Sequence, residues 1–192
     1  MDFTSTMHAN SIRLSTLSSH LNISRHGARI LGCTLGNRPV MYCNPDNIKR
    51  STHPCGPNFG ALSMRSLKDG KYMMDNAERI LPQHGILRDS LFRNIISDET
   101  SLSLTLGHYP SNPSFDSYPA EGCFVYSFNL SPDGRSFMQR LSFVNQSSKT
   151  VPVDLAVHAY FPWVPGLTVA GLERSPFIDD IAPESPAMVE PS

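Results

Sequence analysis

The stretch at residues 124–143 reads FVYSFNLSPDGRSFMQRLSF, and it decides the fold class of the chain. Large apolar side chains occupy every second position before the turn sequence Ser131-Pro132-Asp133-Gly134-Arg135, and Phe137, Gln139, Leu141 and Phe143 continue the period of two after it. A period of two places these side chains on one face of a strand, and Asp-Gly between two such runs is a strong hairpin signal. We therefore predict two antiparallel strands with Asp133 and Gly134 at the hairpin tip.

The same period continues on both sides of this hairpin. Leucines alternate with Ser and Thr at residues 101–106, and Val or Leu takes every second position of residues 151–157. Residues 28–35 and 39–43 are two further strand-like patches. The pattern predicts a mainly β fold, an antiparallel β-sandwich, with Val153, Leu155 and Val157 buried and Asp154 on the opposite face.

Composition excludes several classes of protein. The chain has 192 residues, 16 prolines and 12 glycines, which suits one domain of short strands better than a helical fold. A net charge of -1 argues against a nucleic-acid partner, and no apolar run reaches the roughly 18 residues that a membrane span needs. The four cysteines lack CxxC spacing, so we expect reduced thiols and a cytoplasmic location.

The chain divides into two parts by sequence pattern. Residues 1–22 are polar and are expected to form a weakly ordered N-terminal segment or a first strand. Residues 23–192 are expected to form a single, C-terminally shortened β-sandwich domain. Within it, residues 44–82 are rich in Pro, Gly, Asn and Asp, which predicts a long irregular segment with a functional role.

The sequence Arg25-His26-Gly27-Ala28-Arg29 matches the RHGxR text of histidine phosphatases. Those enzymes also need a second His with an acidic neighbour on a parallel α/β scaffold. This chain has no His-Asp or His-Glu pair, and its strands are predicted to be antiparallel. The segment is therefore interpreted as a turn that leads into the strand at residues 28–35.

Gln83, His84 and Arg88 form the first candidate site. If Ile86 and Leu87 begin a strand, His84 and Arg88 lie on the same face. An imidazole beside a guanidinium suits a polyhydroxylated or phosphorylated ligand, whereas the alternative is a surface loop with a capping His.

His158 is the second candidate. It lies on the strand face opposite Val157 and precedes the aromatic residues Tyr160, Phe161 and Trp163. Sugar C–H faces stack on aromatic rings while hydroxyls form hydrogen bonds, so this arrangement suits a sugar site. The alternative is a structural His on a half-polar strand.

Three sequence elements in a fixed order resemble the aldose 1-epimerase (galactose mutarotase-like) family. They are Pro57-Asn58-Phe59-Gly60, Pro82-Gln83-His84-Gly85-Ile86-Leu87-Arg88 and His158-Ala159-Tyr160-Phe161. The resemblance covers residues 24–180 and is greatest to the branch with the glucose-6-phosphate 1-epimerases. It implies a large antiparallel β-sandwich that binds sugar on its concave face.

The resemblance also implies roles for individual residues. His158 corresponds to the general acid, and His84 to a His that holds sugar hydroxyls near the ring oxygen. Arg88 corresponds to an Arg close to the substrate phosphate. Sugar-binding counterparts are Gln83, Asp179 and a basic residue at Lys49 or Arg50. Glu190, in Met188-Val189-Glu190-Pro191, resembles the Glu-Pro element around the catalytic base.

The implied reaction is interconversion of the anomers of a hexose or hexose 6-phosphate by acid–base ring opening. It needs no metal or other cofactor, and the partner is a small sugar. The chain ends 34 residues after His158, whereas the family's catalytic Glu follows much later. The alternative is therefore an inactive carbohydrate-binding relative. The weakest alternative is a metal site at Cys33, Cys43, His53 and Cys55, because His-x-Cys is poor zinc spacing.

Overall fold

The computed structural model describes residues 11–42, 58–59, 70–82, 84–157, 161, 165, 176–177 and 187–188. The chain divides into two compact units, residues 1–162 and residues 163–192. In the second unit, β13 (Pro176–Phe177) pairs antiparallel with β14 (Ala187–Met188). The architecture below is that of the first unit. That residues 23–192 form a single domain stays a prediction.

The first sheet is a meander of four antiparallel strands in the order β1-β2-β3-β4. Its strands are β1 (Ser11–Ser15), β2 (His20–Ser24), β3 (Ile30–Leu35) and β4 (Arg38–Tyr42). Gly36 and Asn37, between β3 and β4, both have positive φ, at 53° and 62°. Two such residues make the tight turn whose twist matches an antiparallel hairpin. Both strand-like patches of the sequence therefore lie in this sheet.

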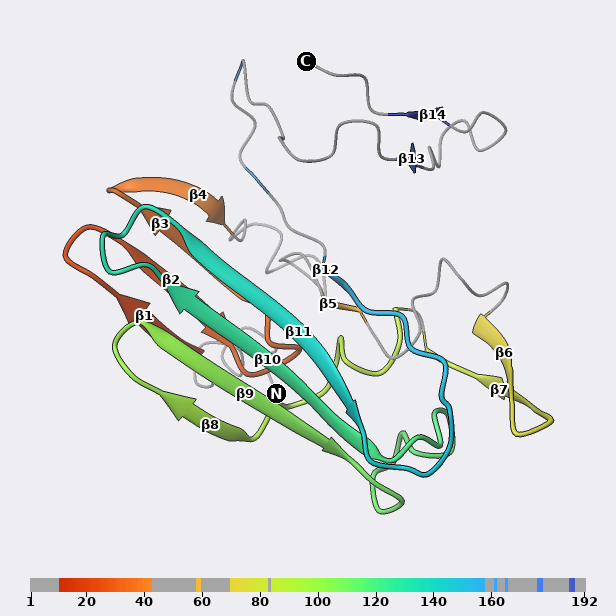
Figure 1. Cartoon of the computed structure of the whole chain (residues 1–192). Coiled ribbons are helices and arrows are strands. Elements are labelled where there is room, and N and C mark those ends of the chain that lie inside the picture. Colours follow the sequence, from red (N-terminus) through yellow and green to blue (C-terminus); the bar gives the residue numbers. More distant parts are fainter. Residues whose placement is uncertain are drawn as a thin grey trace, which may run out of the picture. The chain divides into compact units, whose positions relative to one another are not determined.

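The second sheet holds the hairpin that the sequence predicted. Its order is β11-β10-β9-β8, and all its strands are antiparallel (Figure 1). They are β8 (Asn94–Ser97), β9 (Ser101–His108), β10 (Gly122–Leu130) and β11 (Phe137–Asn145). At the tip of β10 and β11, Gly134 has a φ of 69°, and its N–H donates to the Ser131 carbonyl at 2.8 Å. The predicted turn is confirmed.

The inner faces of the two sheets share one apolar core. Leu14, Leu21 and Ile23 of the first sheet are buried in the same cluster as the alternating residues of β9 and β10. The β9 and β10 members are Leu102, Leu104, Phe124, Tyr126, Phe128 and Leu130. No α-helix occurs among the described residues, so the prediction of a mainly β, antiparallel fold is confirmed. Nor does the described part of the chain contain a helix long and apolar enough to cross a membrane.

Ser19 connects turns of both sheets. Its hydroxyl donates to the Gly134 carbonyl at 2.6 Å and accepts the Gly36 N–H at 2.8 Å. A Cβ on Gly134 would lie 2.6 Å from the Ser19 hydroxyl oxygen, so only glycine allows this approach. The β10–β11 tip is thereby fixed to two turns of the first sheet.

The predicted strand at residues 151–157 is wrong in large part. Only β12 (Ala156–Val157) is a strand, and it pairs with β5 (Asn58–Phe59) rather than with β11. Val153 is 40% exposed and Val157 is 43% exposed, while Asp154 and Leu155 are half-buried. Pro152 supplies no N–H for a ladder, and its carbonyl instead accepts the Tyr118 hydroxyl at 2.7 Å.

The irregular segment predicted at residues 44–82 contains a hairpin. β6 (Lys71–Met74) pairs antiparallel with β7 (Ala77–Ile80). The two turn residues, Asp75 and Asn76, have φ of 54° and 59°. Short polar residues tolerate this left-handed conformation, so the dipeptide is a hairpin signal that our sequence analysis missed.

The thiols agree with the sequence expectation where they are described. Cys33 and Cys123 are free, and burial raises the pKa of Cys33 to about 11. Cys43 and Cys55 lie outside the described residues. A thiol with so high a pKa is inert at neutral pH, because only the thiolate is nucleophilic.

We predict that the core loses stability in acid because of His108. This side chain is buried against Phe115 and Phe124, and its Nε2 donates to the Tyr118 carbonyl at 2.7 Å. Burial lowers its pKa below 6.5, an effect that the hydrogen bond to Tyr118 partly offsets. The unfolded chain therefore binds more protons as the pH falls below about 6.5, and the free energy of unfolding decreases there.

Urea unfolding between about pH 7.5 and pH 5 measures this effect. The wild type should lose more stability over this range than His108→Gln, which cannot take up a proton. The pKa values of His20 and His26 are also lowered by burial, but both residues are present in the two proteins and cancel in the comparison. Equal pH slopes would contradict the assignment to His108.

Candidate functional site

The turn between β2 and β3 begins the candidate site. The His26 N–H donates to the Ser24 hydroxyl at 3.1 Å, and Gly27 and Ala28 have positive φ of 63° and 48°. The chain then enters β3 at Ile30. The interpretation of the RHGxR sequence as a turn leading into a strand is confirmed.

This turn packs against the segment at residues 81–92. The Gly27 N–H donates to the Ser90 carbonyl at 2.8 Å, and the Phe92 N–H donates to the Arg25 carbonyl at 3.0 Å. A Cβ on Gly27 would lie 2.5 Å from the Arg88 carbonyl oxygen. Glycine is therefore required at this position both for its φ and for the close approach to Arg88.

The segment at residues 84–88 is a loop, so the predicted strand beginning at Ile86 and Leu87 is wrong. His84 and Gly85 have φ of 67° and 75°, which no strand contains, and Gly85 donates back to the Pro82 carbonyl at 2.9 Å. Ile86 and Leu87 are both buried and anchor the loop in the core. The argument that His84 and Arg88 share a strand face therefore does not hold.

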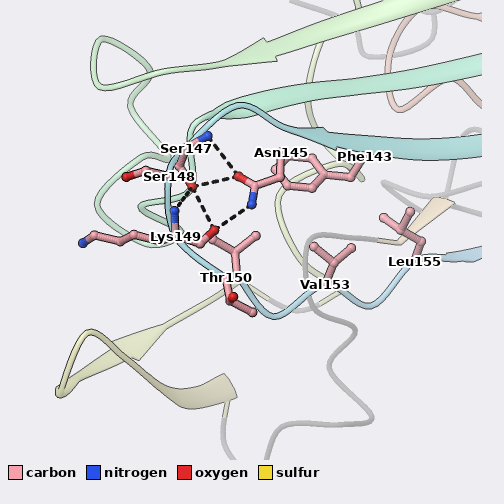
Figure 2. A pocket seen from close by; sticks show the side chains of 9 residues that line it. Phe143, Asn145, Ser147, Ser148, Lys149, Thr150, Val153 and Leu155 are labelled. Atoms are coloured by element: carbon pink, nitrogen blue, oxygen red, sulfur yellow. Dashed lines mark hydrogen bonds between the residues drawn. The ribbon is translucent and has the colours of Figure 1, made fainter.

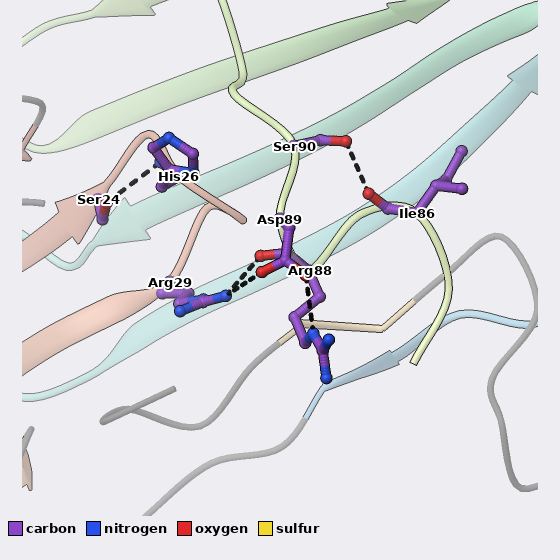
Figure 3. Close-up of polar contacts among 7 residues, drawn as sticks. All are labelled: Ser24, His26, Arg29, Ile86, Arg88, Asp89 and Ser90. Carbon is purple, nitrogen blue, oxygen red and sulfur yellow. Dashed lines mark hydrogen bonds and ion pairs between the residues drawn. The ribbon is translucent and has the colours of Figure 1, made fainter. Parts of the chain in front are cut away.

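Three charged side chains meet where the turn and the loop touch. Arg29 Nη2 lies 3.3 Å from Asp89 Oδ1 and donates to the Arg88 carbonyl at 2.5 Å. Arg88 Nε lies 3.0 Å from Asp89 Oδ2. Figure 3 shows the Asp89 carboxylate between the two guanidinium groups. We call these residues the Arg29–Asp89–Arg88 cluster.

The cluster combines two guanidinium groups that are buried or nearly buried with one exposed carboxylate. The Arg29 side chain is 0% exposed and that of Arg88 is 14% exposed, whereas Asp89 is 55% exposed. Burial lowers the pKa of Arg29, and the Asp89 carboxylate acts in the opposite direction. Burial and Arg29 also lower the pKa of His26 in the adjacent turn. One carboxylate serves two guanidinium groups, so these three side chains together are cationic.

Several nitrogens of the cluster have no hydrogen-bond partner among the described residues. In Arg29 they are the buried Nε and Nη1. In Arg88, Asp89 engages only Nε, and no described residue accepts a hydrogen bond from Nη1 or Nη2. The edge formed by Nη1 and Nη2 has the geometry that binds two oxygens of a phosphate or carboxylate.

Six of the predicted site residues lie outside the described part of the chain. They are Lys49, Arg50, Gln83, His158, Asp179 and Glu190. His84 and Arg88 are described and stand at the two ends of one short loop. The predicted convergence of His84, Arg88 and His158 in one cleft stays a prediction. So does the weak metal alternative, since three of its four residues are also outside; no three His, Cys, Asp or Glu side chains gather among the described residues.

An open hollow of about 500 Å³ lies at the end of β11 and contains none of the predicted site residues (Figure 2). Its polar lining is engaged in the chain's own turn. Asn145 Nδ2 donates to the Lys149 carbonyl at 2.7 Å, and the Ser147 hydroxyl donates to Asn145 Oδ1 at 2.7 Å. Lys149 Nζ pairs with Asp75 at 2.8 Å. These groups hold the turn in place, and the cationic cluster is the better candidate for binding.

Sequence reasoning missed Arg29 and Asp89 as members of the site. Both stood in segments that we had singled out, but the two partners of Arg29, Arg88 and Asp89, lie 59 and 60 residues away along the chain. The only available signal was a charged residue at the start of an otherwise apolar strand. Such a residue is buried only when it is paired.

Comparison with known proteins places the chain among its relatives. The sequence profile of the aldose 1-epimerase family matches residues 10–185. The chain belongs to the aldose 1-epimerase family. Comparison of the chain with curated protein sequences finds no significant match.

Several solved structures resemble the chain. The Slr1438 protein from Synechocystis sp. PCC 6803 has a TM-score of 0.77 at 19% identity, over 93% of this chain and 63% of that one. A galactose mutarotase related enzyme from Lactobacillus acidophilus has a TM-score of 0.66 at 22% identity, over 85% and 52%. A putative aldose 1-epimerase from Escherichia coli K12 has a TM-score of 0.62 at 21% identity, over 81% and 53%. These TM-scores establish the shared fold, and the chain spans between half and two thirds of the length of these structures.

Proposed function

We propose that this chain acts as a mutarotase that interconverts the anomers of a hexose 6-phosphate. The observation that carries the proposal is the Arg88 guanidinium, which Asp89 holds through Nε while Nη1 and Nη2 have no hydrogen-bond partner among the described residues. Family membership supports the reaction class, and the cationic cluster supports a negatively charged sugar.

The proposed reaction requires an acid and a base on opposite sides of the sugar ring. The base removes the proton of the anomeric hydroxyl, the acid protonates the ring oxygen, and the ring opens to the aldehyde. Closure on the other face of the aldehyde, with the proton transfers reversed, gives the second anomer. We assign the acid to His158 and the base to Glu190, with His84 holding hydroxyls near the ring oxygen. No redox step occurs, so no cofactor is needed.

Substrate recognition is assigned to the residues around the loop at 81–91. Arg88 binds the phosphate, together with Lys49 or Arg50, while Gln83 and Asp179 bind sugar hydroxyls. His84 is half-buried, which suits a side chain that contacts a ligand on one side and the protein on the other. A phosphorylated sugar is an intracellular metabolite class, and the described cysteines are free, so we retain the cytoplasm as the proposed location.

We predict that Arg88→Ala discriminates between phosphorylated and neutral sugars. Loss of charge-assisted hydrogen bonds should weaken the affinity for glucose 6-phosphate about ten- to a hundredfold, with little effect on glucose. NMR titration measures both affinities, and line-shape or exchange spectroscopy on the anomeric protons measures interconversion. Arg135→Ala, at the exposed β10–β11 tip, is the matched control and should bind both sugars as the wild type does.

The outcomes separate the candidate functions. Equal effects of Arg88→Ala on both sugars would remove the phosphate assignment. Binding of glucose 6-phosphate by the wild type without any interconversion would instead favour the inactive carbohydrate-binding relative. Absence of both binding and interconversion would overturn the proposed function.

A further inference from the structure

The Arg29–Asp89–Arg88 cluster leaves buried hydrogen-bond donors of Arg29 without partners among the described residues. The guanidinium of Arg29 is fully buried, yet its Nε and Nη1 have no partner among the described residues. Only Nη2 is engaged, and both of its contacts are to the Arg88–Asp89 dipeptide. A buried group that served stability alone would be expected to have its donors satisfied. All the described hydrogen bonds of the Arg29 side chain therefore go to Arg88 and Asp89.

We infer that Arg29 and Asp89 are positioning residues that fix the Arg88 guanidinium for an anionic group of the ligand. The inference rests on the proposed function, because it needs Arg88 to bind the sugar phosphate. It adds two residues that do not themselves contact the ligand.

The geometry explains how the positioning works. A long Arg side chain loses considerable rotamer freedom when it binds a ligand, and a side chain fixed beforehand has less to lose. Asp89 Oδ2 fixes the head of Arg88 at Nε, 3.0 Å away, which turns the Nη1–Nη2 edge away from the carboxylate. Arg29 fixes the other end, because its Nη2 holds the Arg88 carbonyl at 2.5 Å.

Arg29 also gives Asp89 its orientation. Asp89 is more than half exposed and on its own would sample several rotamers. Its Oδ1 faces Arg29 at 3.3 Å and its Oδ2 faces Arg88, so the carboxylate plane is set from both sides (Figure 3). Because two guanidinium groups share this carboxylate, Asp89 does not neutralise the site, and an incoming phosphate still meets positive charge.

A double-mutant cycle tests whether Asp89 acts through Arg88. In the wild-type background, Asp89→Asn should weaken the affinity for glucose 6-phosphate about tenfold and leave glucose unchanged. In an Arg88→Ala background, Asp89→Asn should cause no further loss of affinity, because the side chain that Asp89 positions is gone. Glu78→Gln, which removes the carboxylate of the exposed Lys71–Glu78 pair on β6 and β7, is the matched control and should change neither affinity.

Arg29 is tested by the conservative variant Arg29→Lys, because its burial makes Arg29→Met prone to misfold. Arg29→Lys keeps the charge but cannot reach the Arg88 carbonyl and the Asp89 carboxylate with one planar group. It should weaken the affinity for glucose 6-phosphate and for inorganic phosphate about tenfold and leave the affinity for glucose unchanged. Circular dichroism and urea unfolding check that each variant is folded.

These outcomes distinguish the inference from the proposed function. If the wild type binds neither glucose 6-phosphate nor inorganic phosphate, both fail. Suppose that the wild type binds the sugar phosphate, but Asp89→Asn lowers its affinity as much in the Arg88→Ala background as in the wild-type background. Only the positioning role is then overturned. If Arg29→Lys and Asp89→Asn reduce the affinities for glucose 6-phosphate and glucose equally, the two residues merely hold the loop in place. This result also overturns the positioning role.

Discussion

Replacing His158 by asparagine is expected to slow anomer interconversion by about 10²–10⁴-fold, the usual contribution of a general acid. Asparagine keeps a similar shape and can donate a hydrogen bond, but it cannot transfer a proton to the ring oxygen. The affinity for glucose 6-phosphate should change little, because Arg88 and the other assigned contacts remain. Exchange spectroscopy on the anomeric protons gives the rate, and titration of the same sample gives the affinity.

His20→Asn is the matched control for this experiment. His20 begins β2, at the opposite end of that strand from the turn that enters the candidate site, and undergoes the same chemical change. Its interconversion rate should equal that of the wild type. A His158→Asn protein as fast as the wild type would show that another group is the acid.

Glu190→Gln examines the base in the same assay. If Glu190 removes the anomeric proton, the rate should fall by a similar factor, since the amide cannot accept a proton. Unchanged interconversion in this variant would show that the base lies elsewhere. Together with His158→Asn, it establishes whether the acid–base pair assigned here operates.

Phe124→Ala should destabilise the fold by about 3–5 kcal/mol, the largest stability effect that we predict. Phe124 is fully buried on β10, and its ring centroid lies 4.6 Å from that of Phe143 on β11. Truncation removes these contacts and leaves a cavity that the two paired strands cannot close without breaking register. Urea unfolding at neutral pH measures the loss.

Val125→Ala, one residue further along β10, is the control for register. Val125 lies on the outer face, opposite Thr105 and Ser142. Its replacement by alanine should lower the free energy of unfolding by about 1 kcal/mol at most. Similar losses for Phe124→Ala and Val125→Ala would mean that the two faces of β10 are equally buried. The register described above would then be wrong.

The fold was predictable where pattern and turn chemistry agreed. In residues 122–145, alternation and the Asp133-Gly134 turn indicated the same hairpin, so strand type, the shared apolar face and the tip all followed from local sequence. At residues 151–157 the alternation was equally regular, but Pro152 supplied a conflicting signal that we passed over. Alternation reports which side chains share a face only when a neighbouring strand is present to form the ladder.

The site was less predictable because its contacts join distant parts of the chain. Family motifs identified His84 and Arg88, but local spacing placed them on a strand, and the left-handed backbone at His84 and Gly85 rules this out. A non-glycine residue in that conformation has no reliable sequence signal. The pairing of Arg29 with Asp89 depends on how the β2–β3 turn packs against the loop, which no periodicity encodes.

The Ser19 hydroxyl has a consequence for the order in which the chain folds during synthesis. Its acceptor on Gly134 is made 115 residues later, so the first sheet leaves the ribosome with that contact unfilled. Contacts this far apart in sequence form slowly, because a long loop must close before they contribute. The contact that fixes the first sheet to the tip of β10 and β11 should therefore form only after that tip has emerged.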